Sequence, residues 1–210
     1  MKLILMFCIS INLLSLNACS QTGKPKQPVG GSCEGCEAVF ESPVAFEKLS
    51  WEDTLPDFNE PGPKMMISGI VYQADGKTPA KDVVLYIYHT DQSGKYSNKN
   101  NEKGDAGRHG YIKGWIKTNE KGAYKFYTLK PASYPGGQNP AHIHPIIKEP
   151  NFSEYWIVEF LFEDDPVLTD EERKRQPKHG GSGIISLTEK DGILYGERNI
   201  YLGKNIPGYQ

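Results

Sequence analysis

Two histidines that stand two residues apart are the first residues in this sequence whose spacing suggests chemistry. His142 and His144 lie in the run 140–145, which reads PAHIHP. On a β-strand, residues i and i+2 point to the same face, so the two imidazoles would lie close enough to bind one metal ion. The alternative is that the pair merely makes a strand surface polar. The spacing alone therefore indicates a metal site without establishing it.

Two tyrosines precede the histidine pair in short turn-rich segments. Tyr134 lies eight residues before His142 in the run PASYPG (131–136), and Tyr96 lies in the run GKYS (94–97). Prolines restrict the backbone of the first run, so this loop would hold Tyr134 rigidly just ahead of the histidines. Either tyrosine alone would more often be a packing residue, because a ring with one polar tip is common at the margin of a sheet.

Short segments rich in β-branched and aromatic residues would position these side chains. We expect strands over 66–73, 83–89, 111–118, 123–128, 142–148, 155–162, 183–188 and 193–202. Glycine-containing turns separate most of them, which is typical of a sandwich. Helix is expected only over 43–49 and 169–175, where Thr169 would cap the first turn. The expected fold class is therefore all-β, a β-sandwich of two sheets with one or two short helices.

Length, composition and charge restrict the possible functions. The 210 residues are 38% hydrophobic and 24% charged, which is enough for one domain with a packed core. The 24 basic and 26 acidic residues give a net charge of −2. Because these charges are interleaved and form no basic stripe that would neutralise phosphates, nucleic acid is not an expected partner.

The N-terminal residues have the pattern of an export signal. Lys2 precedes an uncharged, mostly apolar run over 3–16 that is too short to cross a bilayer. The run ends in Leu16-Asn17-Ala18-Cys19, which resembles the lipobox of bacterial lipoproteins. We expect a signal peptide over 1–18, lipidation of Cys19, a flexible tether over 19–32 and a location at the bacterial cell envelope, on the periplasmic or outer-membrane face. The alternative is an ordinary secretory signal with an incidental cysteine.

Cys33 and Cys36 would be the two cysteines left in the exported domain. In an oxidising compartment, the run CEGC (33–36) favours a local disulfide. A redox or metal-binding role is the less favoured alternative, because a second cysteine pair is absent and the run follows a Gly-Gly linker. We assign 33–65 to an N-terminal extension and 66–210 to the β-sandwich.

Taken together and in order, these pieces resemble the intradiol ring-cleavage dioxygenases, the non-haem ferric enzymes that include catechol 1,2-dioxygenase and protocatechuate 3,4-dioxygenase. The resemblance is carried by the segments 68–71, 83–89, 94–96, 115–126, 128–134, 140–144 and 162–166. It implies a β-sandwich that holds Fe(3+) between its sheets. It also implies that Tyr96, Tyr134, His142 and His144 are the four iron ligands.

The ligand types agree with a ferric ion. Two phenolates and two neutral imidazoles partly neutralise a trivalent cation, so the set would hold iron as ferric. By resemblance, the substrates are a small aromatic diol and O2. The diol would bind the iron through both oxygens while Tyr134 leaves the metal and accepts a proton. Cleavage would then break the carbon–carbon bond between the two hydroxylated carbons.

Two positions depart from the family pattern. Asn139 stands where the family usually has an arginine, and Glu159 stands where it tends to have a glutamine. Both changes make the pocket more negative, so we expect a substrate that differs in charge from that of ordinary catechol-cleaving relatives. Arg108, in a glycine-bracketed insertion between the two tyrosines, is the candidate to restore the missing cation.

Two other functions remain open. The chain could be an iron-binding pseudo-enzyme, or it could be a non-catalytic transthyretin-like β-sandwich module, which the segments 69–71, 75–79 and 122–126 also resemble. Three histidines lie outside the proposed ligand set. We expect His89 to pack at a strand end, and His109 and His179 to lie in polar loops without an identifiable partner.

Overall fold

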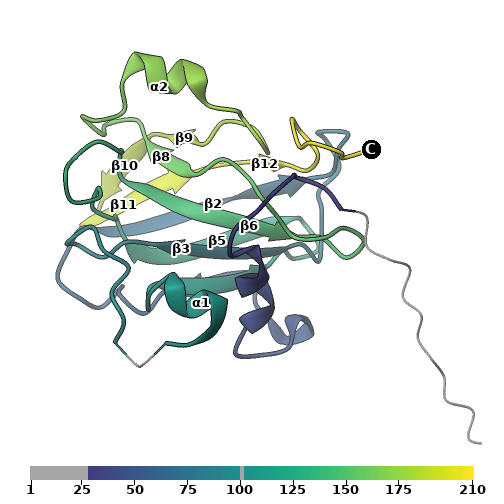
Figure 1. The fold of residues 1–210 in the computed structure, drawn as a ribbon, viewed down its shortest axis with the longest axis horizontal. Helices are drawn as coiled ribbons and strands as arrows, with labels where there is room; N and C mark the ends of the chain where they lie inside the picture. Colours follow the sequence, from purple (N-terminus) through teal and green to yellow (C-terminus); the bar gives the residue numbers. More distant parts are fainter. Residues whose placement is uncertain (1–27, 100–101) are drawn as a thin grey trace, which may run out of the picture.

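The computed structural model describes residues 28–99 and 102–210, and its main feature is a pair of facing sheets (Figure 1). The first sheet contains β1 (Glu52–Thr54), β5 (Ala123–Leu129), β2 (Lys64–Tyr72), β11 (Ile193–Glu197) and β10 (Leu187–Lys190) in that order, with β12 (Ile200–Tyr201) also paired to β2. The second contains β4 (Lys113–Lys117), β3 (Val84–His89), β6 (His142–Lys148), β8 (Phe160–Phe162) and β9 (Ile184–Ile185), with β7 (Tyr155–Trp156) paired to β6. The expectation of an all-β sandwich is confirmed.

The side chains of β6 point alternately to the two faces of its sheet, and this decides on which face the histidines lie. Ile143 and Ile147 belong to the apolar core between the sheets. Ile146 belongs to a second apolar cluster on the outer face of the same sheet. Because successive side chains alternate between faces, His142 and His144 project outward with Ile146. The expectation that the metal lies between the sheets is therefore wrong, since the ligand candidates lie on the outer face of one sheet.

The N-terminal segment covers this outer face. The 3-10 helix η1 (Cys36–Glu41) packs on β3, β4 and β6, and Trp115 Nε1 donates a hydrogen bond to the Val39 carbonyl oxygen at 2.9 Å. The short helix α1 (Gly104–Arg108) lies beside η1 and contributes Ala106 to the same cluster (Figure 1). The buried members of this cluster are Cys36, Ala38, Val39, Val84, Tyr86, Ala106, Trp115 and Ile146.

The packed part of the chain begins inside the range expected to be a flexible tether. Val29 is only 5% exposed and belongs to the main core, and Gly30 N–H donates to the Pro207 carbonyl oxygen at 2.8 Å. The expected extension over 33–65 is likewise part of the sandwich, because it contributes β1 and the first residues of β2. The proposed lipobox and Cys19 lie outside the described residues. Within the described part, no helix has the length and apolar character needed to cross a membrane.

Helix prediction was correct at one site and wrong at others. α2 (Asp170–Arg175) has Thr169 as its N-cap, and Thr169 and Glu172 form a reciprocal capping box. The helix expected over 43–49 is only a 3-10 turn, η2 (Phe46–Lys48). η1 and α1 were not predicted. The first turn of α1 is capped by Glu41, whose carboxylate accepts hydrogen bonds from Asp105 N–H at 2.8 Å and Ala106 N–H at 3.0 Å.

Most expected strands exist, but the later ones are interrupted. The strand expected over 155–162 is divided into β7 and β8. The segments expected over 183–188 and 193–202 each contain two short strands. In the first, the pairing partner changes from β8 for β9 to β11 for β10, whereas in the second both β11 and β12 pair with β2.

Candidate metal-binding site

The structure brings together the four side chains that were predicted to bind iron. Tyr96 Oη lies 2.6 Å from Tyr134 Oη and 3.0 Å from His144 Nε2. His142 Nε2 lies 3.0 Å from His144 Nε2 and 3.2 Å from Tyr134 Oη. Tyr134 Oη and His144 Nε2 are 3.5 Å apart. Two phenol oxygens and two imidazole nitrogens therefore converge on one point.

A close contact between two loops places the tyrosines. Gly94, two residues before Tyr96, has a left-handed backbone with φ of 74°. A Cβ atom at this position would lie 2.1 Å from the Ser133 carbonyl oxygen, so only glycine lets the loops approach this closely. Asp91 fixes the same turn, since its Oδ1 accepts hydrogen bonds from the backbone N–H of Ser93 at 2.8 Å and of Lys95 at 3.2 Å. The contact between the two loops therefore requires glycine at position 94.

Backbone and side-chain contacts orient the histidine rings. His142 Nδ1 donates to the Pro140 carbonyl oxygen at 2.7 Å, which leaves the lone pair of Nε2 directed at the cluster. His144 lies opposite Tyr88 in the antiparallel pairing of β3 and β6, and their rings stack with centroids 4.7 Å apart. His144 Nδ1 lies 3.8 Å from Glu159 Oε1. Each imidazole thus presents Nε2 to the same point.

Burial controls the protonation states of the donors. Desolvation, followed by the hydrogen bond with Tyr134, raises the pKa of the Tyr96 phenol well above its ordinary value of 10. Desolvation, followed by the charge of a protonated His142, lowers the pKa of His144 to about 3. At neutral pH, His144 therefore has a free nitrogen lone pair, and Tyr96 holds its proton unless a cation stabilises the phenolate.

The donor set fits a hard, highly charged metal ion. Among the described residues, no group of three or more histidine, cysteine, aspartate or glutamate side chains is placed to hold a metal. Any metal held at this cluster would therefore depend on the two tyrosine oxygens as well as on His142 and His144. Anionic phenolates suit a trivalent ion better than a divalent one, because they offset more of its charge.

Two hollows meet at the cluster and share His144 and Glu159. The larger, about 350 Å³, is lined by Tyr134, Asn139, Pro140, His142, His144, Glu159, Leu161, Glu172 and Gln176. The smaller, about 200 Å³, is lined by Ser32, Cys33, Glu34, Tyr88, His144, Pro145, Ile146, Trp156, Ile157 and Glu159. Tyr96 lines neither of them, so the donors differ in their access to a small molecule.

Asn139 and Glu159, the two positions that depart from the family pattern, both line the larger hollow. Arg108 does not line either hollow. Its guanidinium pairs with Asp105 Oδ1 at 2.8 Å and with Glu34 Oε1 at 3.7 Å, and more than half of its side chain is exposed. Arg108 therefore lies outside the cavity and does not take the place of the missing arginine beside the ligands.

Tyr88 and His109 are neighbours of the site that sequence reasoning missed. His109 stacks on Tyr88 with centroids 3.7 Å apart and planes within 5°, and its Nδ1 lies 2.8 Å from Tyr86 Oη. Tyr88 therefore lies between His109 and His144. The expectation that His109 lies in a polar loop without a partner is wrong. His109 directly precedes a glycine, and the sequence around it has no alternation of apolar and polar residues that would have predicted its position against the sheet.

A buried polar chain supports the loop that carries Tyr134. His89, at the end of β3 as expected, has its Nε2 2.6 Å from Thr128 Oγ1, and Asp57 Oδ1 lies 2.8 Å from the same hydroxyl. The next residue, Thr90, donates from its hydroxyl to the Ala132 carbonyl oxygen at 2.7 Å. Ala132 is two residues before Tyr134, so this chain connects the core to the tyrosine loop.

The predicted disulfide between Cys33 and Cys36 is present, and its Cα atoms are 5.6 Å apart. It lies at the start of η1, and Cys33 lines the smaller hollow. The disulfide loop therefore forms one wall beside the ligand candidate His144. His179, the remaining histidine, contacts Trp156 of the same wall with centroids 4.4 Å apart, so it too has a partner that was not expected.

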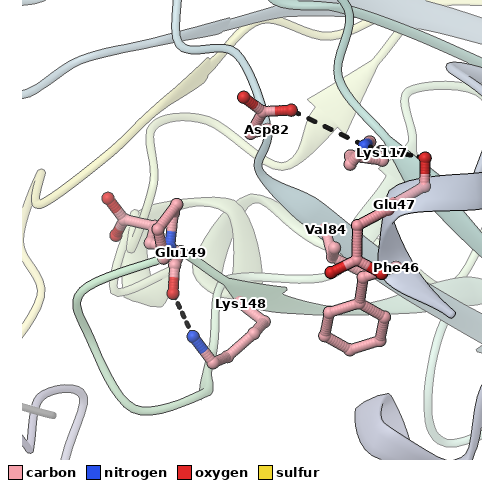
Figure 2. A pocket seen from close by; sticks show the side chains of 8 residues that line it. Phe46, Glu47, Asp82, Val84, Lys117, Lys148 and Glu149 are labelled. Carbon is pink, nitrogen blue, oxygen red and sulfur yellow. Dashed lines mark hydrogen bonds and ion pairs between the residues drawn. The ribbon is translucent and has the colours of Figure 1, made fainter. Parts of the chain in front are cut away.

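Another hollow, of about 360 Å³, lies at the opposite ends of β3 and β6 (Figure 2). Figure 2 shows contacts of its two lysines: Lys117 Nζ lies 3.6 Å from Asp82 Oδ1, and Lys148 Nζ contacts the backbone carbonyl oxygen of Glu149. Tyr155 donates a hydrogen bond to the Glu149 carboxylate at 2.6 Å. Lys117, Lys148 and Glu149 are therefore engaged within the fold, and none of the four donor residues lines this hollow.

Comparisons with known proteins agree with the geometry. Residues 42–176 match the sequence model of a family described as Dioxygenase. The protocatechuate 3,4-dioxygenase beta chain of Burkholderia cepacia is 26% identical over 113 residues, which are 51% of this chain and 48% of that protein. Catechol 1,2-dioxygenase 2 of Acinetobacter lwoffii is 26% identical over 133 residues, which are 56% of this chain and 46% of that protein. The chain thus spans about half the length of these relatives.

A solved structure extends the similarity to most of the chain. The dioxygenase domain of a carbohydrate-binding fusion protein from Streptomyces sp. SirexAA-E superposes with a TM-score of 0.57 at 19% identity, and covers 76% of this chain and 93% of that domain. At this identity, the structural match shows a shared fold. Because the family model covers more than half of the chain, the chain belongs to the intradiol dioxygenase family.

Proposed function

We propose that this protein is a ferric dioxygenase that cleaves the ring of a catechol-type vicinal diol between its two hydroxylated carbons with O2. The observation that carries the proposal is the convergence of two phenol oxygens and two imidazole nitrogens, each of which lies within 2.6–3.5 Å of at least two of the others. Family membership supports ring cleavage of catechol-type substrates in general.

Tyr96, Tyr134, His142 and His144 would hold the iron, and each would contribute one atom. When bound, ferric iron would supply the Lewis acidity and the redox coupling that make a chelated diol reactive toward O2. The protein supplies a neutral imidazole through the low pKa of His144, and the hydrogen bond from His142 Nδ1 to the Pro140 carbonyl oxygen directs His142 Nε2 at the cluster. It also supplies the Tyr96 phenol, whose pKa is raised by burial, so that this phenol gives up its proton only when a cation stabilises the phenolate.

The two tyrosines have different roles in this proposal. Tyr134 lines the larger hollow and Tyr96 does not. Tyr134 Oη is therefore the donor within reach of a bound diol, and it accepts the proton that the diol must lose. Tyr96, held by the Gly94 turn and screened from the hollow, keeps its position throughout.

Iron analysis and a visible spectrum test the proposal. Protein purified from iron-replete cells should contain iron and show the colour of ferric tyrosinate. Tyr96→Phe or Tyr134→Phe should remove or shift the band, and His142→Gln should reduce the iron content. Tyr195→Phe, on β11 of the other sheet, is the matched control and should leave both unchanged.

Oxygen consumption with a catechol separates catalysis from iron binding alone. The parent should consume O2 and yield a muconate-type dicarboxylate, and Tyr134→Phe should be slowed most. Iron-loaded, coloured protein that consumes no O2 would contradict the catalytic part and support an iron-binding pseudo-enzyme. Colourless, iron-free protein would contradict the whole proposal and favour a non-catalytic β-sandwich module.

A further inference from the structure

We propose that the smaller hollow is a binding subsite for a positively charged amine, so that the preferred substrates are catechols whose side chain carries an ammonium group. This inference rests on the proposed function, because the catechol ring would lie in the larger hollow against Tyr134 and His142. The two hollows share His144 and Glu159, so a side chain that leaves the ring can pass from one to the other.

The charges that line the two hollows all have one sign. Glu34 and Glu159 line the smaller hollow, and Glu159 and Glu172 line the larger one. Neither set of lining residues contains a lysine or an arginine. A carboxylate on the substrate would therefore be repelled, whereas an ammonium group would be attracted. Asn139 adds no charge beside the ligands.

The smaller hollow combines its carboxylates with aromatic side chains. Trp156 and Tyr88 line it together with Glu34 and Glu159. Both faces of the Tyr88 ring are covered by His109 and His144, which leaves its edge and its phenol oxygen for the hollow. Carboxylates beside a tryptophan ring and a phenol oxygen are the groups that bind an alkylammonium ion, through charge, hydrogen bonds and cation–π contact.

The disulfide loop is the part of this wall that lies outside the match to the family model. Glu34 lies between Cys33 and Cys36, outside the residues 42–176 that match the family model. Its neighbour Arg108 lies 3.7 Å away but has a closer partner in Asp105, at 2.8 Å. The group of Glu34, Asp105 and Arg108 therefore keeps a net negative charge at the mouth of the hollow.

The cations near the site do not cancel this charge within the hollow. Arg198 is buried, stacks on Phe160 with its guanidinium 4.4 Å from the ring centroid, and does not line either hollow. Arg173 of α2 pairs with Glu163 Oε1 at 2.6 Å, and it too lies outside both sets of lining residues. The Arg198 guanidinium interacts electrostatically with Glu159 and offsets part of its charge, but no guanidinium lines either hollow, so an ammonium group would contact carboxylates there.

Three catechols whose side chains share a two-carbon unit test the inference: aminoethyl-, ethyl- and carboxyethyl-catechol. In the iron-loaded parent, kcat/KM should fall in that order, and added salt should narrow the differences. Glu34→Gln should reduce the preference for aminoethyl- over carboxyethyl-catechol by about two- to five-fold, the effect of one solvent-screened charge. The change in kcat/KM should be smallest for ethylcatechol, whose side chain carries no charge.

Glu37→Gln is the matched control, because Glu37 is an exposed carboxylate of η1 that does not line the hollow. Equal kcat/KM for the three catechols in the parent, the reverse order, or an equal effect of Glu37→Gln would overturn the subsite. Binding should also be measured from the perturbation of the ferric visible band. If no catechol is cleaved, the proposed activity fails, and the order of binding constants still decides the subsite. Protein that takes up no iron would overturn both.

Discussion

Gly94→Ala is expected to damage both the stability of the protein and the geometry of its four-donor cluster. The left-handed φ of 74° costs a residue with a Cβ atom about 1–2 kcal/mol. The new Cβ atom would also lie 2.1 Å from the Ser133 carbonyl oxygen, so the two loops must separate by roughly 1 Å. Overpacking of this kind costs about 1–3 kcal/mol. We therefore expect the free energy of unfolding to fall by about 3 kcal/mol.

Urea unfolding should measure this loss against a control that separates its two causes. Gly192 has nearly the same φ, 75°, but a Cβ atom added there would meet nothing within 4 Å. Gly192→Ala should therefore show the backbone cost alone, about 1 kcal/mol. Because Gly94 and Ser133 are close in sequence to the two ligand tyrosines, Gly94→Ala should also weaken iron uptake, whereas Gly192→Ala should not. If the two variants unfold at the same urea concentration and bind iron equally well, the argument that the loop contact places the tyrosines is wrong.

Thr128→Val should lower the free energy of unfolding by about 2–3 kcal/mol, because it removes the hydroxyl between buried His89 and Asp57; Thr128→Ser should recover most of the loss in the same urea titration. Acidification from pH 6.5 toward pH 4 should destabilise the parent more than His109→Gln. Burial lowers the pKa of His109 to about 4, so the unfolded chain binds the proton first. Melting temperatures that fall equally in both proteins would contradict this. Cys19→Ala should leave the protein outside the membrane fraction; a variant that partitions with membranes as the parent does would show that the anchor lies elsewhere.

The parts of the fold that could be predicted are those specified by local patterns. The bounds of β6 agree with the predicted 142–148, because three isoleucines give this short run the β-branched character that is typical of a strand. The cap of α2 was predicted because Thr169 and Glu172 lie within one helical turn. The four donors were predicted from a resemblance, and the structure brings them together.

The parts that could not be predicted depend on contacts between distant residues. α1 contains two glycines and has no cap of its own; Glu41, 64 residues from Asp105, supplies the acceptor for its first turn. β1 is short and polar, and it becomes a strand by pairing in parallel with β5. The outer position of the site was missed for a related reason. Which face of β6 meets the core depends on the side chains of the opposite sheet, and the N-terminal segment that covers the other face has no strand pattern.

The disulfide between Cys33 and Cys36 affects the shape of the smaller hollow more than the stability of the β-sandwich. It closes a loop between residues only three positions apart, so it restricts little of the unfolded chain and contributes little to the stability of the sandwich. Its main effect is to hold residues 32–36 against the smaller hollow. Substitutions within this loop can therefore alter the ligand preference while the two-sheet core stays intact. Under the proposed function, such an arrangement would let the substrate preference change by mutation of a single peripheral loop, without a compensating change in the interior.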